Sequence, residues 1–225
     1  MTIRSFFVAG SFALVVACGA SGSESAGTQG AMQQSSARAE CAPNDTACQN
    51  DGLDAPLAVG ARLPVDVKIT ARGVAAPKLV LEAARADVLD VNGAELFGRG
   101  RGWSSVLVAG EDGVVLDFFT ISVVVPDHLE IYRLTEDGAP EAAPLPAKIQ
   151  VTPGDDIELS VKAFDGATRL LGDLDATWSL DNAVGTLMDS GRRASRRLRV
   201  KAPGNATIEI KTSGSTKTLA LEVLP

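Results

Sequence analysis

The sequence is poor in the residues from which most recognisable active sites are built. It has one histidine, His128, among 225 residues. A serine hydrolase needs its histidine to be oriented by an acid and to face an activated serine. The neighbouring Asp127 is expected on the opposite face of a strand, and the chain has no G-x-S-x-G elbow, Walker loop or H-E-x-x-H motif. No catalytic residue is predicted, and His128 is expected at the surface or on an edge strand.

The same scarcity argues against a metal centre. A tetrahedral zinc site needs four Cys or His ligands, and one His with a single spare pair of cysteines does not supply them. Asp155, Asp156, Asp173 and Asp175 flank predicted strands, where solvated turn acids are expected rather than Ca²⁺ ligands. The sequence therefore predicts no metal and no cofactor. An enzyme whose site follows no known pattern remains an alternative.

The chain also lacks an excess of basic residues. Lys and Arg number 21 against 28 Asp and Glu, which gives a formal net charge of -7 at pH 7. A protein that binds nucleic acid through its overall charge is normally basic, so no nucleic-acid partner is predicted. A local basic patch is still compatible with this composition.

The apolar run at the N-terminus is too short to span a bilayer comfortably. It covers Phe6 to Val16, is interrupted by Gly10 and Ser11, and falls short of the roughly 20 residues of a transmembrane helix. Arg4 precedes it and the small residue Ala17 follows it. This order is typical of a targeting segment that is removed from the mature protein.

The four residues from Val15 to Cys18 resemble the lipobox of bacterial lipoproteins, which is an aliphatic residue, a loosely chosen one, a small one and then cysteine. The resemblance covers residues 1–18. It implies that residues 1–17 are a signal peptide and that Cys18 carries a diacylglyceryl group and an acylated amino group, so that lipid anchors the protein to a membrane. Gly19 stands where Asp often acts as an inner-membrane retention signal, which favours the outer membrane of a double-membrane bacterium. An ordinary secretory signal is the alternative.

A polar, low-complexity stretch follows. Residues 19–40 are rich in Gly, Ser, Ala and Gln, with Met32 as the one large apolar side chain. Such a segment buries too little surface to offset the entropy of ordering it. We therefore expect residues 18–52 to form a lipidated flexible tether, in which residues 19–40 have an r.m.s. reach of roughly 25 Å.

Cys41 and Cys48 form an even pair once Cys18 is assigned to lipid. Pro43, Asn44 and Asp45 between them are turn formers, so a short loop can close there. Because an exported protein meets an oxidising environment, the pattern predicts a local disulfide. Two free thiols are the alternative.

From residue 53 onward the apolar residues recur with period two, which indicates β-strands. In residues 62–70 the apolar side chains are Leu63, Val65, Val67 and Ile69. Further apolar or alternating runs are separated by Gly, Asp, Asn or Pro, and helical spacing is hardly sustained. The sequence predicts an all-β protein.

The pattern of strands repeats along the chain. Gly60 and Gly154 each precede a long strand, Gly102 and Gly204 each precede a penultimate strand, and Pro126 and Pro225 each follow a last one. Two tandem β-sandwiches, residues 53–125 and 126–225, are therefore expected rather than one larger domain.

The residue pattern is similar to bacterial immunoglobulin-like domains over about residues 55–225. In the first repeat the likeness rests on Val88, Val91, Gly93, Gly98, Gly102 and Val106. In the second it rests on the stretches TPGDDIELSVKAFD, ATWSL and APGNATIEI. The resemblance implies two tandem immunoglobulin-like β-sandwiches and says little about function.

The most distinctive polar feature is a basic set near the C-terminus. It comprises Arg192, Arg193, Arg196, Arg197, Arg199 and Lys201. If Leu198 and Val200 point into the core, alternate cations share the outer face of one strand, where they suit an anionic polysaccharide, a phosphate-bearing lipid or an anionic protein surface. The alternative is a solvated edge strand, on which the charges prevent pairing with strands of other molecules.

Together these features predict a non-enzymatic, lipid-anchored protein of the cell envelope that displays two immunoglobulin-like modules for binding or structural roles. An accessory subunit of a larger envelope complex, docking through strand edges or the basic set, is the second hypothesis.

Overall fold

The computed structural model describes residues 27–41, 45–69, 77–181 and 184–225. Cys18 and the predicted signal peptide lie outside these residues. Strands make up almost all of the regular structure, and the single α-helix has six residues. No helix in the described ranges is long and apolar enough to cross a membrane. The prediction of an all-β fold is confirmed.

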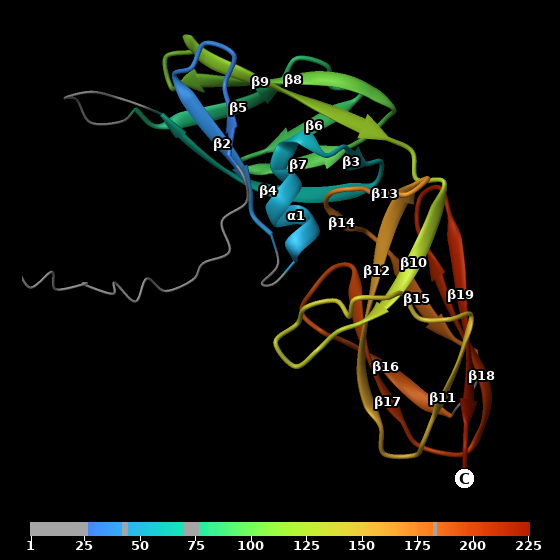
Figure 1. The fold of residues 1–225 in the computed structure, drawn as a ribbon. Coiled ribbons are helices and arrows are strands. Elements are labelled where there is room, and N and C mark those ends of the chain that lie inside the picture. The colour runs from blue at the N-terminus through green and yellow to red at the C-terminus, as the bar shows by residue number, and fades with distance from the viewer. Residues whose placement is uncertain (1–26, 42–44, 70–76, 182–183) are drawn as a thin grey trace, which may run out of the picture.

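The first module, residues 27–124, is a sandwich of two sheets (Figure 1). One sheet has the strand order β1 (Thr28–Gln29), β2 (Ser35–Ala39), β4 (Ala61–Ile69), β7 (Glu95–Gly98) and β6 (Leu89–Asn92). The other has the order β3 (Leu57–Ala58), β9 (Val115–Val124), β8 (Gly102–Gly110) and β5 (Leu79–Ala83). Strand β3 runs parallel to β9 and the other pairs are antiparallel.

The second module, residues 128–225, repeats this plan. One sheet has the order β10 (His128–Arg133), β12 (Asp156–Asp165), β17 (Ser195–Val200) and β16 (Gly185–Asp189), with β13 (Thr168–Arg169) paired to β12. The other has the order β11 (Lys148–Val151), β19 (Thr216–Val223), β18 (Gly204–Lys211) and β15 (Thr177–Leu180). Strand β11 is again parallel to the last strand.

The shared strand order is that of an immunoglobulin-like sandwich. Strands β2, β4, β7 and β6 of the first module and β10, β12, β17 and β16 of the second each form one sheet in that order, as in the A-B-E-D sheet of that fold. Strands β5, β8 and β9 of the first module and β15, β18 and β19 of the second lie in the other sheet, as do C, F and G. Gly102 and Gly204 occupy equivalent positions at the start of β8 and β18, with φ of 149° and 144°, a backbone conformation that L side chains rarely adopt.

Each sandwich has an alternating core. Ile157, Leu159, Val161 and Ala163 of β12 are all buried, as their period of two predicts. In β4 the alternation holds for Leu63 and Val65. Val67 and Ile69 beyond them are only partly buried.

The prediction of a flexible tether is wrong for residues 28–41 and 45–52, the part of residues 28–52 that the structure describes. Residues Ser35–Ala39 form β2, which pairs in register with Val65–Ile69 of β4, and Ala37 is fully buried. Small side chains at this position let the strand pack closely against the sandwich. The low hydrophobicity of residues 35–39 suggested disorder because it hid a first strand that contributes backbone hydrogen bonds rather than large apolar side chains.

The turn between β1 and β2 is held by one buried acid. Asp117 of β9 is fully buried, and its carboxylate accepts hydrogen bonds from the amides of Met32, Gln34, Ser35 and Phe118 at 2.7–2.9 Å and from the Ser35 hydroxyl at 2.9 Å. Burial raises the pKa of this carboxyl, but the hydrogen bonds outweigh that effect and the pKa lies below its ordinary value. Asp117 thus fixes the start of the described chain onto the first module.

Candidate functional site: the junction between the modules

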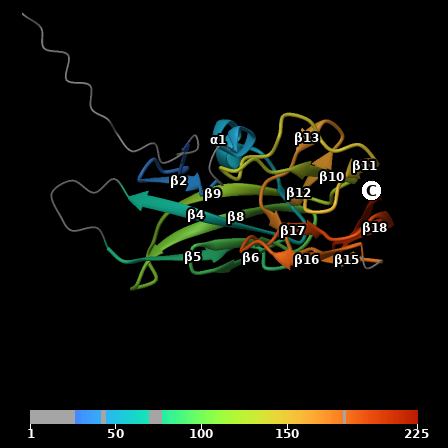
Figure 2. The ribbon, with the colours of Figure 1, turned by 90° about the horizontal axis from the view of Figure 1, so that it is seen from below.

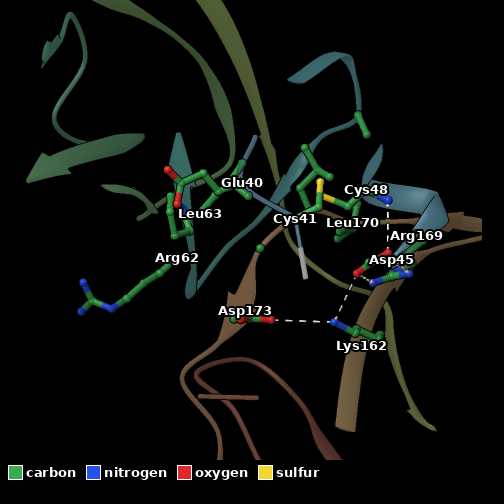
Figure 3. Close-up of a pocket in the computed structure, with 14 residues that line it drawn as sticks. Glu40, Cys41, Asp45, Cys48, Arg62, Leu63, Lys162, Arg169, Leu170 and Asp173 are labelled. Carbon is green, nitrogen blue, oxygen red and sulfur yellow. Dashed lines mark hydrogen bonds and ion pairs between the residues drawn. A yellow bond between two sulfur atoms is a disulfide. The ribbon is translucent and has the colours of Figure 1, made fainter. Parts of the chain in front are cut away.

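The two modules meet end to end at an angle, with α1 (Thr46–Asp51) and the short strand β14 (Asp173–Leu174) at their boundary (Figure 1). In the view from below, α1 of the first module again lies on the side of the second (Figure 2). A cavity of about 40 Å³ lies here, lined by residues from both modules (Figure 3). This volume holds only one to three water molecules. We call this region the junction. Its chemistry is that of charged groups that fasten the two modules together.

A piece of the second module extends the sheet of the first. Strand β14 pairs antiparallel with the start of β4, in the register Asp173 with Arg62 and Leu174 with Ala61. The amide of Leu171 donates to the carbonyl of Pro56 at 2.8 Å. These bonds cross the module boundary through the backbone, so they do not depend on particular side chains.

A glycine makes this close approach possible. Gly172 has φ of 88°, and a Cβ atom there would lie 2.8 Å from the Leu57 side chain and 2.9 Å from Ala61 Cβ. Any other residue would bring both backbone strain and steric overlap to the boundary.

The Cys41–Cys48 disulfide predicted from the sequence is present. It lies in the connection between β2 and β3, directly before η1 (Gly52–Asp54). Asp45 lies between the two cysteines and caps α1, its carboxylate accepting a hydrogen bond from the Cys48 amide at 3.2 Å. The bridge thus closes a loop that contains Asp45, a residue of the first module that contacts the second.

Asp45 is the centre of a buried charge cluster. Its two oxygens accept hydrogen bonds from Arg169 of β13 at 2.8 and 2.5 Å, and Lys162 Nζ of β12 lies 3.7 Å from the same carboxylate. Asp173 Oδ1 lies 3.7 Å from Lys162 on the other side. Asp45 is 3% exposed and Lys162 8% exposed. In Figure 3 Arg169 and Lys162, both from the second module, point toward the Asp45 carboxylate of the first, and Asp173 lies on the far side of Lys162.

Burial and charge act in opposite directions on these groups. Burial raises the pKa of Asp45, but the hydrogen bond and the positive charge of Arg169 outweigh it, so the pKa lies below its ordinary value. Burial lowers the pKa of Lys162, the charge of Arg169 lowers it further, and the nearby Asp173 and Asp45 only partly restore it. Asp45 is therefore held as the anion that the two cations require.

A second, more exposed set of ion pairs closes the other side of the junction. Arg62 contacts Glu95 at 3.1 Å and Asp175 at 3.0 Å, and Arg193 contacts the same two acids at 3.3 and 3.7 Å. Arg62 and Glu95 belong to the first module, whereas Asp175 and Arg193 belong to the second. The four residues form a closed ring of alternating charge across the boundary.

The predicted basic set does not form one patch. Arg193 belongs to this ring, Arg192 donates to the carbonyl of Gly138 at 2.9 Å, and Arg196 lies 4.0 Å from Asp189. Each of these three arginines thus binds groups of the protein itself, and the three do not form a shared binding surface.

The two arginines on the outer face of β17 share one acid. Leu198 and Val200 are buried as predicted, which turns Arg197 and Arg199 outward. Both contact Asp156 of β12, at 2.5 and 3.3 Å, and Lys201 follows the strand as an exposed residue. Strand β17 lies between β12 and β16, so the alternative of a charge-protected edge strand is wrong.

His128 begins β10, an edge strand, and stacks on Phe164 with ring centroids 5.3 Å apart. Its Nδ1 contacts Asp127 Oδ1. The expectation that Asp127 lies on the opposite face is wrong, because Asp127 precedes the strand and does not follow its alternation. Asp127 also accepts a hydrogen bond from the Gly166 amide at 2.8 Å, which is a turn contact.

The sequence did not point to Asp45, Arg62, Glu95, Lys162 or Arg169 as junction residues. Apart from Asp173, which is 11 residues from Lys162, their partners lie 33 to 124 residues away along the chain, beyond the reach of any local pattern. The period of two in β12 places Lys162 on the face opposite Leu159, Val161 and Ala163, so its burial is visible only in the structure.

No protein-family model matches the sequence, and no curated protein matches it. Among solved structures, the S-layer protein rSbsC(31-844) is similar at 16% identity and a TM-score of 0.33, over 72% of this chain and 23% of that one. Invasin, a bacterial integrin-binding protein, is similar at 12% identity and a TM-score of 0.33, over 88% of this chain and 41% of that one. The titin Ig tandem domains A164-A165 are similar at 11% identity and a TM-score of 0.27, over 75% and 90%. The chain spans about a quarter of the S-layer protein and less than half of invasin.

Proposed function

We propose that this protein is a lipid-anchored component of a bacterial cell envelope that holds two immunoglobulin-like modules at a fixed angle, as a non-catalytic display or spacing element. The observation that carries the proposal is the junction. Tandem modules move relative to each other by default unless a substantial interface joins them. Here backbone pairing, a buried charge cluster and an ion-pair ring all cross the boundary.

The linker supports the same conclusion. Strand β9 ends at Val124 and β10 begins at His128, so residues 125–127 connect the modules. So short a connection, with Pro126 in it, leaves little slack. The extra cross-boundary contacts then restrict the remaining rotation, and the two modules act as one bent body.

The proposed anchor holds this body close to the membrane. If Cys18 carries lipid, nine residue steps separate it from Gly27, the first described residue. Fully extended, these steps span at most about 32 Å. We therefore expect the first module to stay near the membrane surface, closer than a 22-residue tether would allow, since that tether fully extended spans up to about 79 Å.

Two measurements test the proposal. Radioactive palmitate should label the wild-type protein and not Cys18→Ser, and equal labelling of both would refute the anchor. Small-angle X-ray scattering of the oxidised chain should fit a single intermodule angle. A distribution as broad as that of freely jointed modules would refute the fixed display geometry.

Binding of an anionic polysaccharide or of an envelope protein through the basic set remains a second proposal. Arg197 and Arg199 both contact Asp156, so an anionic ligand that binds these two arginines must compete with the Asp156 carboxylate. Salt-sensitive retention on a polyanion, lost when Arg197, Arg199 and Lys201 are changed to Ser, would support it. The role of an accessory subunit is tested by crosslinking and co-purification of defined envelope proteins.

A further inference from the structure

We infer that the Cys41–Cys48 disulfide is a redox-controlled lock on the junction, which a dithiol reductant of the envelope opens. This inference rests on the proposed function, because it concerns how the fixed angle between the modules is regulated. The geometry points to Asp45, the residue between the two cysteines, as the part of the lock that engages the second module.

The lock is connected directly to the bridge. The Asp45 carboxylate accepts the amide of Cys48, a bridged residue, and the same carboxylate accepts two hydrogen bonds from Arg169. One side chain thus joins the bridged segment to a strand of the other module. Any motion that shifts Cys48 relative to β2 moves the carboxylate away from Arg169.

The bridge restricts an otherwise long connection. Strand β2 ends at Ala39 and β3 begins at Leu57, and the bridge ties residue 41 to residue 48 within that span. Breaking the bridge between residues 41 and 48 restores chain entropy to the opened state of that loop. This increase corresponds to an equilibrium constant for local opening that is larger by a factor of roughly 50. Without the bridge, Asp45 must be ordered against that entropy.

Release of Asp45 has a specific consequence at Lys162. The ammonium group would keep only Asp173, at 3.7 Å, as a neighbouring acid. A buried cation that loses a partner is strongly destabilised. We expect Asp45 and Cys48 to move aside so that water reaches Lys162. The β14 pairing and the ion-pair ring remain, so the junction loosens and the modules stay together.

The bridge is accessible to the chemistry that this requires. Cys48 is buried, but Cys41 is partly exposed, and both line the junction cavity. A thiolate of the reductant attacks Sγ of Cys41, forms a mixed disulfide and releases Cys48 as a thiolate, which takes a proton. The second thiol of the reductant then displaces Cys41. The reductant leaves as a disulfide, and the protein gains two electrons and two protons.

The test measures acylation of Lys162 in the full chain by mass spectrometry, with exposed Lys78 as an internal reference, before and after dithiothreitol treatment. Reduction should raise the Lys162 rate about tenfold or more, within the ceiling of roughly 50, and reoxidation should reverse it. Asp45→Asn should give the high rate with the bridge intact. Asp54→Asn, a change in η1 outside the bridged segment, should leave the rate low.

Two results would overturn the lock. One is a Lys162 rate unchanged by reduction when thiol counting shows two free cysteines. The other is a low rate in Asp45→Asn. The wild type is reduced reversibly, and its β-sheet circular dichroism should be retained. The test therefore stands even if a Cys41→Ser/Cys48→Ser variant fails to fold. Scattering separates the two proposals, since a flexible oxidised chain contradicts the fixed angle, whereas a rigid chain with an insensitive Lys162 contradicts only the lock.

Discussion

Replacing Asp117 with Asn should loosen the turn between β1 and β2 and, with it, the pairing of β2. The carboxylate accepts two hydrogen bonds at Oδ1, from Met32 and Phe118, and three at Oδ2, from Gln34 and from the amide and hydroxyl of Ser35. An Asn side chain keeps one accepting oxygen. In its better orientation the amide nitrogen faces the two amides at the Oδ1 position, so two partly buried donors lose their acceptor.

The expected cost is large for so small a change. A buried donor left without an acceptor costs about 1–3 kcal/mol, and because these two donors are only partly buried we expect the lower end of that range for each, a total loss of about 2–3 kcal/mol. A domain with an ordinary unfolding free energy of about 5–15 kcal/mol retains its fold after this loss. Urea denaturation of Asp117→Asn should therefore show a lower midpoint, and amide exchange should accelerate at Ser35–Ala39 before it does in β12.

The pH dependence gives an independent check. Because the pKa of Asp117 is lowered in the folded protein, its stabilisation is present above the unfolded pKa of about 3.9 and is lost as pH falls through the folded value. The Asn variant should lose less stability than the wild type over that acid range. Asp112→Asn, in an exposed turn, is the matched control. A midpoint for Asp117→Asn equal to that of the control would refute the anchoring role.

Further predictions concern the junction. Asp45→Ala should lower the free energy of unfolding by about 3–5 kcal/mol, because it leaves Lys162 and Arg169 without their shared anion; a loss under 1 kcal/mol in urea would contradict this. Gly172→Ala should lower the melting temperature and broaden the scattering-derived angle, since the new Cβ overlaps Leu57 and Ala61. An unchanged angle would show that β14 pairing is dispensable. Asp156→Asn should strengthen polyanion retention by freeing two arginines, and weaker retention would argue against the basic set as a binding surface.

The fold was predictable where the signal was local. The period of two in β12, the turn glycines Gly102 and Gly204, and the short spacing of Cys41 and Cys48 each report a constraint contained within a few residues. Strand β2 was missed because its pairing with β4 depends on a partner about 30 residues away. Small, weakly hydrophobic residues carry no sign of such a partner.

The candidate site was less predictable for the same reason. The basic set was visible as a run of arginines, but its electrostatic role depends on strand order, which places Asp156 beside Arg197 and Arg199. Reading the run as one surface overlooked Arg193, which belongs to the junction. Charge composition alone does not reveal which cations are already neutralised by residues far away in the sequence.

The repeated plan also explains why the lock lies in the first module and not in the second. The connection from β2 to β3 in the first module and the equivalent connection from β10 to β11 in the second are each held by an arginine of the second module. In the second module Arg192 donates to the backbone carbonyl of Gly138, a bond within one module. In the first, Arg169 donates to the Asp45 side chain across the boundary. A carbonyl accepts in any redox state, whereas Asp45 depends on a bridge that reductants can open. The equivalent connection is therefore held by a redox-independent hydrogen bond in the second module, from Arg192 to Gly138, and by a bridge-dependent one in the first, from Arg169 to Asp45.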